Sequence, residues 1–364
     1  MKVGEILKVL ESLAPLRRAE DFDNVGLLLG NTQQTVTGVL VCHDALEAVV
    51  DEAVAKNCNF IVAFHPIIFG GLKSITGKNY VERAVLKMIK NDIALYAIHT
   101  ALDNDAAGVS AYLAEALGLQ NCRFLVPKKE QLRQLTTYVP EANVNQVKDA
   151  LFMAGGGHIS NYSECSFSNN GTGTFKPEED ATPVIGAVGK RSEVNEVRLE
   201  MLFEAGQEAA LLNALKQAHP YEEVAYQIYK LENESSNAGL GLIGEFENEL
   251  SEADFLQLTK SVLKTPVLRH SAFINKKIKR VAVLGGSGSS AIHAAKRAKA
   301  DAYITADLKY HDFFSAENQL LLVDGGHYET EQFTKYKIAD FLKEKLPNFA
   351  IILANTNTNP VNYL

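Results

Sequence analysis

An alternation of apolar and amphipathic segments between residues 39 and 98 constrains the fold of this chain more than any other feature. Short apolar runs at 39–42, 60–64 and 94–98 predict buried strands, and helix-compatible segments at 45–56 and 81–91 separate them. Such alternation is typical of a largely parallel sheet covered by helices, which binds ligands beyond the carboxyl ends of its strands. His65 and Asp103 stand at those ends in this segment.

The same order of elements recurs near the end of the chain. Apolar runs at 279–284, 302–305 and 320–323 predict strands, a segment at 291–300 predicts a helix between the first two, and residues 329–346 predict a helix after the last. We therefore expect an α/β protein with two pseudo-repeated α/β halves that form one core. The polar strand ends of both halves then face one crevice.

The segment 125–243 interrupts the repeated pattern. Its order of strand, helix, strand, strand, helix and strand is that of a ferredoxin-like α+β domain, and a polar linker at 232–239 bounds it downstream. With 364 residues the chain is long enough for two or three domains. We expect a discontinuous α/β core made of residues 1–124 and 244–364, and an inserted α+β domain at 125–243.

Composition excludes several classes of function. The net charge is −8 and the basic residues are scattered, which argues against binding to duplex nucleic acid or to a membrane surface. The sequence has no signal-peptide pattern and no apolar run long enough to cross a bilayer, so we expect a cytoplasmic protein. The 4 cysteines are far apart without a Cys-x-x-Cys pair, so a metal would need histidines and carboxylates.

Four polar side chains at the predicted crevice are candidate metal ligands: His65, Asp103, His327 and Glu331. If a helix starts near His327, then His327 and Glu331 project from the same face, a spacing that lets both bind one ion. Two imidazoles and two carboxylates suit zinc, iron or manganese, and a carboxylate can bridge a pair of ions. We predict a metal site with Glu331 as the bridge; the alternative is a buried histidine beside a solvated glutamate.

Other polar residues near the crevice have a functional and a structural interpretation. Asp307 and His311 follow a predicted strand and are candidates for general acid and base, or else they belong to a capped loop. His99 either orients a ligand or satisfies a buried strand end. His43 and Asp44 follow the first strand, where we expect them to cap a helix.

A glycine-rich turn suggests a competing function. Gly285, Gly286 and Gly288, followed by Ala291, match the Gly-x-Gly-x-x-Ala pattern of dinucleotide sites. No acidic residue closes the next strand in a position to hold a ribose, and Asp307 is a poor candidate. A nicotinamide-dependent oxidoreductase is therefore the weakest of the functions considered.

Four segments of the predicted core and four of the insert carry a family resemblance. The core segments are Phe22-Asp-Asn-Val-Gly-Leu27, Phe64-His65-Pro-Ile-Ile-Phe69, His99-Thr-Ala-Leu-Asp103 and Gly326-His327-Tyr-Glu-Thr-Glu331. The insert segments are Tyr138-Val-Pro140, Gly155-Gly-Gly-His158-Ile-Ser-Asn-Tyr162, Gly171-Thr-Gly-Thr-Phe175-Lys-Pro177 and His219-Pro-Tyr-Glu-Glu223. Together they resemble the GTP cyclohydrolase I type 2 family, also called NGG-one-interacting-factor-three-like proteins, whose longer bacterial members carry an insert similar to PII and CutA proteins.

The resemblance implies a dinuclear metal site in a homohexamer. Carried over by position, His65 and Asp103 hold the first of two divalent ions, His327 the second, and Glu331 both. Many members have two adjacent histidines where this chain has Phe64 and His65. The second ion here therefore either binds more weakly or takes water or a nearby group such as His99.

The resemblance also implies a divalent-metal-dependent hydrolase that acts on a small, nucleotide-like substrate. A metal ion lowers the pKa of a coordinated water toward neutrality, and the hydroxide would attack C8 of guanine if the substrate is GTP. The alternative is a non-catalytic protein that binds or delivers metal, or a regulatory one, because a carrier tolerates an exchangeable second ion.

Overall fold

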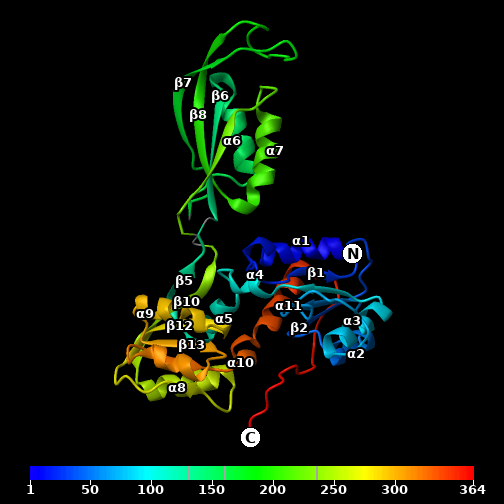
Figure 1. Cartoon of the computed structure of the whole chain (residues 1–364), viewed down its shortest axis with the longest axis vertical. Coiled ribbons are helices and arrows are strands. Elements are labelled where there is room, and N and C mark those ends of the chain that lie inside the picture. Colours follow the sequence, from blue (N-terminus) through cyan, green and yellow to red (C-terminus); the bar gives the residue numbers. More distant parts are fainter. Residues whose placement is uncertain (130, 160, 235–236) are drawn as a thin grey trace. The chain divides into compact units, whose positions relative to one another are not determined.

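The computed structural model describes residues 1–129, 131–159, 161–234 and 237–364. The chain forms two compact units, a core unit made of Met1–Val126 and Asn237–Leu364, and an insert unit made of Pro127–Ser236 (Figure 1). The described elements are helices together with strands of several sheets, so the expected mixed α/β architecture is confirmed.

The first sheet of the core has five strands in the order β1-β4-β3-β2-β15. Their bounds are β1 (Gly26–Leu29), β2 (Val39–Cys42), β3 (Phe60–Ala63), β4 (Ala94–Ala97) and β15 (Ile351–Leu353). Strands β15, β2, β3 and β4 run parallel, and β1 pairs antiparallel with β4 at the edge. Every residue of β2, β3 and β4 is buried, which explains why these strands are unbroken apolar runs in the sequence.

Helices cover both faces of this sheet. Apolar side chains of α1 (Val3–Leu13) and α11 (Thr334–Lys345) pack with one set of strand residues, and those of α2 (Glu47–Ala55) and α3 (Tyr80–Lys90) pack with the other set. Successive strand side chains point to opposite faces, so the two sets alternate along each strand. The first sheet is thus a buried middle layer.

The second sheet of the core has six strands in the order β11-β14-β13-β12-β10-β5. Their bounds are β5 (Gln120–Pro127), β10 (Gly239–Leu250), β11 (Arg269–His270), β12 (Ile278–Ser287), β13 (Ala302–Ala306) and β14 (Leu321–Asp324). Strands β12, β13 and β14 are parallel, while β10 and β11 join them antiparallel. Helices α5 (Val109–Leu117) and α8 (Glu252–Leu263) pack on one face, and α9 (Ile292–Arg297) packs on the other.

Two short helices begin directly beyond strands of the two core sheets. Helix α4 (His99–Asp103) follows β4, and α10 (His327–Glu331) follows β14. The helix expected at 329–346 is in fact two helices, because α10 ends at Glu331 and α11 begins at Thr334. This break lets α10 lie at the strand ends while α11 covers the first sheet.

The glycine-rich segment differs from its prediction. Strand β12 continues to Ser287 instead of stopping before Gly285, and only the short 3-10 helix η4 (Ser289–Ala291) separates it from α9. The remaining 3-10 helices are η1 (Leu16–Arg18), η2 (Glu141–Asn143), η3 (Ala205–Gln207) and η5 (Tyr310–Ala316). None of the helices in the described part of the chain has the length and apolar character needed to span a membrane.

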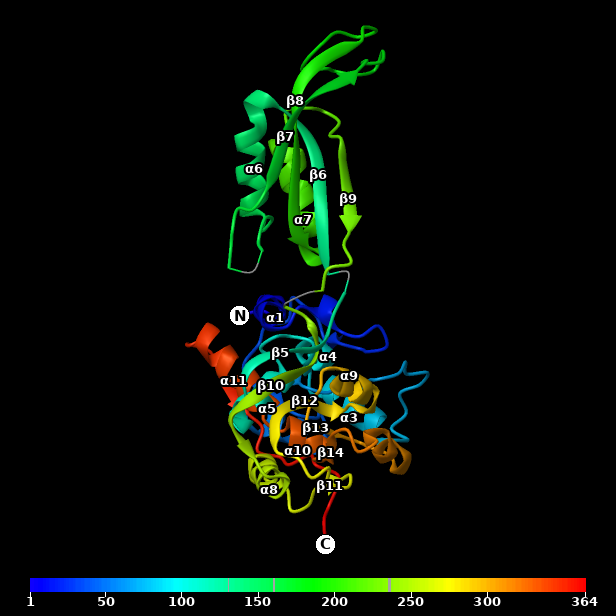
Figure 2. The ribbon, with the colours of Figure 1, turned by 90° about the vertical axis from the view of Figure 1, so that its left-hand side faces the viewer.

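The insert unit contains an antiparallel sheet in the order β7-β8-β6-β9. Its elements are β6 (Leu132–Pro140), α6 (Val144–Met153), β7 (Phe167–Phe175), β8 (Ser192–Glu204), α7 (Glu208–Ala218) and β9 (Tyr226–Lys230). Helices α6 and α7 lie beside this sheet (Figure 2), and their apolar side chains share one cluster with those of the strands. The insert therefore has a hydrophobic core of its own.

Candidate metal centre

Parallel pairing in the first sheet brings the residues after β2, β3 and β4 to one edge. Cys42 pairs with Ala63, and Ala63 pairs with Ala97, so these three strands end at the same level. His43 and His65 follow the first two strands, and the backbone N–H of His65 donates to the carbonyl of His43 at 3.0 Å. The edge predicted from the order of elements is therefore the edge at which these polar residues gather.

Glu331 on α10 is the centre of the cluster. Its Oε2 atom lies 3.2 Å from Nε2 of His65 and 3.2 Å from Nε2 of His327. Neither contact has the geometry of a hydrogen bond, and this buried oxygen has no hydrogen-bond partner. One donor atom from each of the three residues lies within 4.8 Å of the others, which is close enough for one ion to bind all three.

Two further carboxylates hold the imidazole rings. Oδ1 of Asp44 lies 2.8 Å from Nδ1 of His65, and Oδ2 of Asp307 lies 2.7 Å from Nδ1 of His327. When the rings are neutral, a proton on each Nδ1 leaves the Nε2 lone pair free to bind a metal ion beside Glu331. This arrangement of carboxylate and histidine commonly fixes the tautomer of metal-binding histidines.

The charged groups of the cluster shift one another's pKa values. Burial disfavours a charged imidazole, but contacts with Asp307 and Glu331 nevertheless raise the pKa of His327 to about 11. Burial also opposes charge on His65, whereas Asp44 and Glu331 raise its pKa to about 9. Burial likewise opposes ionisation of Glu331, yet the two imidazoles hold its pKa below the usual value. The site therefore stabilises a buried anion by placing positive charge beside it.

The pKa of Asp103, at the end of α4, is shifted in the opposite direction to that of Glu331. Burial and the nearby charge of Glu331 raise the pKa of Asp103 well above the usual value. Its Oδ1 atom is buried and has no hydrogen-bond partner. A buried carboxylate without a partner is costly, and a cation at this place would remove the cost.

The backbone also leaves space around Glu331. A Cβ atom on Gly286 would overlap Oε1 of Glu331 and would lie 3.3 Å from Nε2 of His327. Gly286 has φ +65°, a left-handed conformation that favours glycine. Glycine thus lets the carboxylate lie against the backbone, and the partnerless oxygens of Asp103 and Glu331 and the mixed nitrogen and oxygen donors together fit a divalent ion such as zinc, iron or manganese.

The structure brings some of the predicted site residues together and not others. His65, His327 and Glu331 form the cluster, and Asp103 interacts with it electrostatically. Asp307 contacts His327. The ring of His311 contacts the rings of Tyr310 and Phe314, and His311 does not line the cavity beside the cluster.

The sequence-based interpretation of His43 and Asp44 as helix-capping residues was wrong. Helix α2 starts at Glu47, its N-cap is Leu46, and no side chain caps it. His43 is instead 3% exposed, with Nε2 3.7 Å from Oε2 of Glu331. The signal was available, because both residues follow β2 as His65 follows β3.

Asp23 and His99 support the helix that carries Asp103. Nδ1 of His99 lies 2.9 Å from Oδ1 of Asp23, and Oδ2 of Asp23 accepts hydrogen bonds from the backbone N–H and the hydroxyl of Thr100. Burial raises the pKa of Asp23, but these bonds outweigh it and hold the pKa at about 2. Asp23 therefore fixes the start of α4, a negative charge at a helix N-terminus.

A cavity of about 580 Å³ opens beside the cluster in the core unit. It is lined by strand-end residues and by the C-terminal segment: His43, Asp44, His65, Val267, Arg269, Asp307, Asp324, Gly326, His327, Tyr328, Glu329, Asn359, Pro360, Val361 and Tyr363. Its volume is in the range of small-molecule sites.

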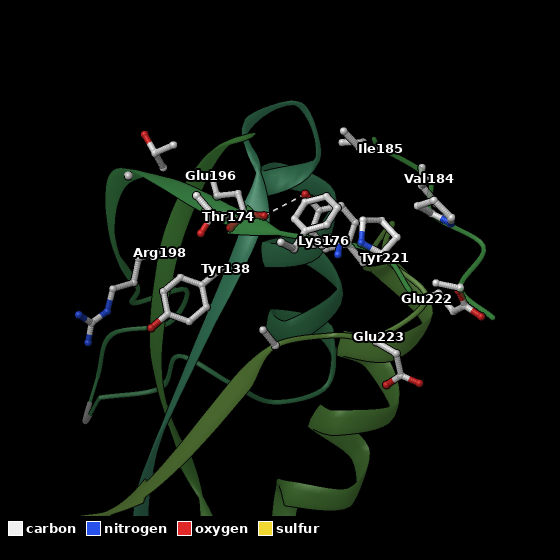
Figure 3. Close-up of a pocket in the computed structure, with 18 of the residues that line it drawn as sticks. Tyr138, Thr174, Lys176, Val184, Ile185, Glu196, Arg198, Tyr221, Glu222 and Glu223 are labelled. Carbon is white, nitrogen blue, oxygen red and sulfur yellow. Dashed lines mark hydrogen bonds between the residues drawn. The ribbon is translucent and has the colours of Figure 1, made fainter. Parts of the chain in front are cut away.

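The insert unit has a separate cavity of about 590 Å³ (Figure 3). Aromatic and charged side chains line it, and the hydroxyl of Tyr221 donates a 2.9 Å hydrogen bond to Oε1 of Glu196. Lys176 and Arg198 add positive charge, and Glu222 adds negative charge. This mixture of charges does not single out one class of ligand.

Comparison with known sequences gives matches along the whole chain. The model of a family described as Duf34/NIF3 (NGG1p interacting factor 3) matches residues 1–360. A Bacillus subtilis protein named GTP cyclohydrolase 1 type 2 homolog is 40% identical, over 99% of this chain and 98% of its own length. A protein of the same name from Staphylococcus aureus is 35% identical over the full length of both chains.

Comparison with solved structures agrees. A Bacillus cereus protein related to NIF3 superposes with a TM-score of 0.87 at 37% identity, covering 100% of this chain and 99% of the other. A Staphylococcus aureus protein superposes with a TM-score of 0.80 at 32% identity, with the same coverage.

Proposed function

Because this chain belongs to the Duf34/NIF3 family, we propose that it is a divalent-metal-dependent hydrolase acting on a small nucleotide-like substrate. The names of its relatives, GTP cyclohydrolase 1 type 2 homolog, indicate the class of substrate. The observation that carries the proposal is the convergence of His65 and His327 on one buried oxygen of Glu331.

The residues of the chain divide into ligands and supports. His65, His327 and Glu331, with Asp103, would hold the ions, which supply Lewis acidity and activate water. Asp44 and Asp307 hold the imidazoles through Nδ1. We therefore propose a positioning role for Asp307 in place of the acid or base role suggested by the sequence. His311 has no role in this proposal.

The cavity beside the cluster supplies features for substrate binding. The guanidinium of Arg269 lines it and pairs with Asp324, whose Oδ2 also accepts from the backbone N–H of Leu308. Arginine suits recognition of phosphate, so we propose that Arg269 faces the anionic part of the substrate. Tyr328 and Tyr363 line the same cavity and give it aromatic surface for a base.

We also propose that the core is a pseudo-repeat and the insert a ferredoxin-like domain. Supporting the first, each core sheet has three successive parallel strands that lead to a short helix bearing ligands. The strand order of the insert supports the ferredoxin-like domain. If its four strands are numbered along the chain, their order across the sheet is second, third, first and fourth. We also propose a homohexamer, which the family resemblance implies, and a cytoplasmic location, because the scattered cysteines fit a reducing compartment.

The test is turnover of GTP by protein loaded with zinc, iron or manganese, followed by product analysis. The hydrolase proposal expects turnover that disappears in both His65→Ala and Glu331→Gln but persists in His293→Ala, a change at an exposed position of α9. Absence of turnover in loaded protein with GTP and with other purine nucleoside triphosphates would contradict it.

The non-catalytic alternative gives a different result in the same experiment. A metal-delivering protein binds the ions tightly but turns over no nucleotide, and it transfers them to an apo-acceptor or chelator at a measurable rate. The insert unit has a cavity and a hydrophobic core of its own. We therefore propose that a ligand bound in the insert regulates the protein, whether the metal centre is catalytic or only delivers metal.

A further inference from the structure

His43 is a buried imidazole that lacks any conventional partner. Its exposed fraction is 3%, and neither Nδ1 nor Nε2 has a hydrogen-bond partner in the described structure. Burying a polar group without a hydrogen bond costs about 1–3 kcal/mol, so buried histidines normally have at least one partner. Packing alone therefore does not explain why a histidine is buried at position 43.

The ring of His43 lies inside the cluster. Its centroid is 4.5 Å from that of His65, and its Nε2 is 3.7 Å from Oε2 of Glu331. Donor atoms of His43, Asp44 and His65 lie within 4.8 Å of one another. Three imidazole Nε2 atoms, those of His43, His65 and His327, thus surround the same carboxylate oxygen.

Aromatic rings fix the orientation of His43. It stacks on Phe64 with a centroid distance of 5.4 Å and an interplanar angle of 26°, and the ring of Tyr328 lies at 78° to it with a centroid distance of 5.2 Å. The ring of Phe64 has no hydrogen-bonding atom, and neither nitrogen of His43 is hydrogen-bonded to Tyr328. The two aromatic rings do hold the imidazole beside Glu331, so a metal ion is the partner that the site can supply.

We propose that His43 is a direct ligand of a divalent metal ion, giving the centre a third imidazole. This inference rests on the proposed metal centre. It adds His43 to the ligands, whereas the sequence had suggested that His43 caps a helix. It also accounts for the ligand expected to be missing at Phe64, because the imidazole of His43 is stacked against that ring. Three imidazoles favour zinc or iron over magnesium and calcium.

The test exchanges the two stacked rings. Full-length wild type, His43→Phe, Phe64→His and the double exchange are loaded with Zn²⁺, dialysed and analysed for metal per chain. Zn²⁺ affinity comes from competition with a chelator, and X-ray absorption counts imidazole ligands. His43→Phe keeps an aromatic ring on Phe64, and the double exchange conserves the volume of the pair. His293→Phe is the control for loss of a histidine outside the site.

His43→Phe is expected to lose one ion per chain or to bind it at least roughly tenfold more weakly, with one imidazole fewer in the absorption spectrum. The double exchange is expected to recover both, while His293→Phe matches wild type. If folded His43→Phe retains the wild-type metal content, affinity and imidazole count, the inference is wrong.

Separate outcomes test the underlying centre. If wild type and Glu331→Gln bind Zn²⁺ equally, the metal centre itself is wrong. If wild type binds metal through His43 without hydrolysing nucleotides, the hydrolase proposal fails while His43 remains a ligand. Near-ultraviolet circular dichroism establishes folding, and His43→Asn provides a smaller substitution if the phenylalanine is not accommodated.

Discussion

Oδ1 of Asp44 lies 2.8 Å from Nδ1 of His65, and Oδ2 of the same carboxylate accepts a 2.5 Å hydrogen bond from the hydroxyl of Thr358. Asp44 thus joins the end of β2, the residue after β3 and the C-terminal segment. Burial raises the pKa of Asp44, but the bond to His65 and the charge of His43 lower it overall. The carboxylate is therefore ionised when it orients His65.

Removing this orienting charge should weaken metal binding without removing a ligand. We expect Asp44→Asn to lower Zn²⁺ affinity by about 10–100-fold, because the amide holds the His65 ring less firmly and reduces its basicity. Chelator competition measures the affinity. Asp51→Asn makes the same change on α2, where the carboxylate is 63% exposed, and should leave affinity unchanged. Equal affinities of the two variants would contradict the role of Asp44.

Glu331→Gln should have the largest effect on metal content. The amide removes the negative charge that His65 and His327 surround, so we expect the purified variant to lose most of its bound metal. Elemental analysis after dialysis measures the loss. Glu344→Gln, on the exposed surface of α11, is the matched control. Retention of wild-type metal content by Glu331→Gln would rule out this carboxylate as the bridge.

Gly286→Ala should disrupt the centre through the backbone. The added Cβ would overlap Oε1 of Glu331, and φ of +65° would be strained, so we expect metal affinity to fall at least tenfold and stability by about 1 kcal/mol. Gly118→Ala imposes similar strain at φ +78° with nothing within 4 Å, so it should cost stability but retain metal. Equal metal loss in both variants would mean that strain, not overlap, is responsible.

Metal affinity should rise with pH. A nitrogen ligand must be unprotonated to bind, whereas His65 and His327 have pKa values of about 9 and about 11 in the metal-free chain. Binding near neutral pH therefore releases about two protons, and affinity increases from about pH 6 to about pH 8. Calorimetry in buffers of different ionisation enthalpy counts the protons. Binding without proton release would show that these imidazoles are neutral before metal arrives.

Glu52 should make stability depend on pH at the acidic end. It accepts hydrogen bonds from the backbone N–H groups of Asn355 and Thr356 and from the hydroxyl of Thr356. Burial raises its pKa, but these bonds and Lys56 outweigh burial and lower the pKa from 4.5 to about 2. Its stabilisation is therefore present above pH 4.5 and is lost as the pH falls through about 2.

We accordingly expect Glu52→Gln to lose about 1 kcal/mol of unfolding free energy at pH 7, because the amide accepts fewer bonds and solvent screens part of the charge. Urea unfolding of both proteins measures the difference, which should shrink toward zero near pH 2. Glu47→Gln, at the start of the same helix, controls for loss of charge. A difference that is constant across this range would contradict the assignment.

The sequence by itself determined the elements whose physical cause is local. Strands β2, β3 and β4 are buried on both faces, so each is a continuous apolar run that can be recognised without its neighbours. His327 and Glu331 lie four residues apart on one short helix, so their proximity is also local. Parallel order placed His65 at the same edge because strand ends of such sheets coincide.

Only the tertiary structure decided which side chains support or join the cluster. Asp307 is 20 residues from His327 in the chain, and Asp44 is 21 from His65, and nothing in the local pattern distinguishes them from capping residues. His43 belongs to the site because β2 lies beside β3 and because Phe64 and Tyr328 hold its ring against Glu331. Periodicity reports which face of an element is apolar, whereas the partner of a polar side chain depends on distances that exist only after the sheets and helices have packed.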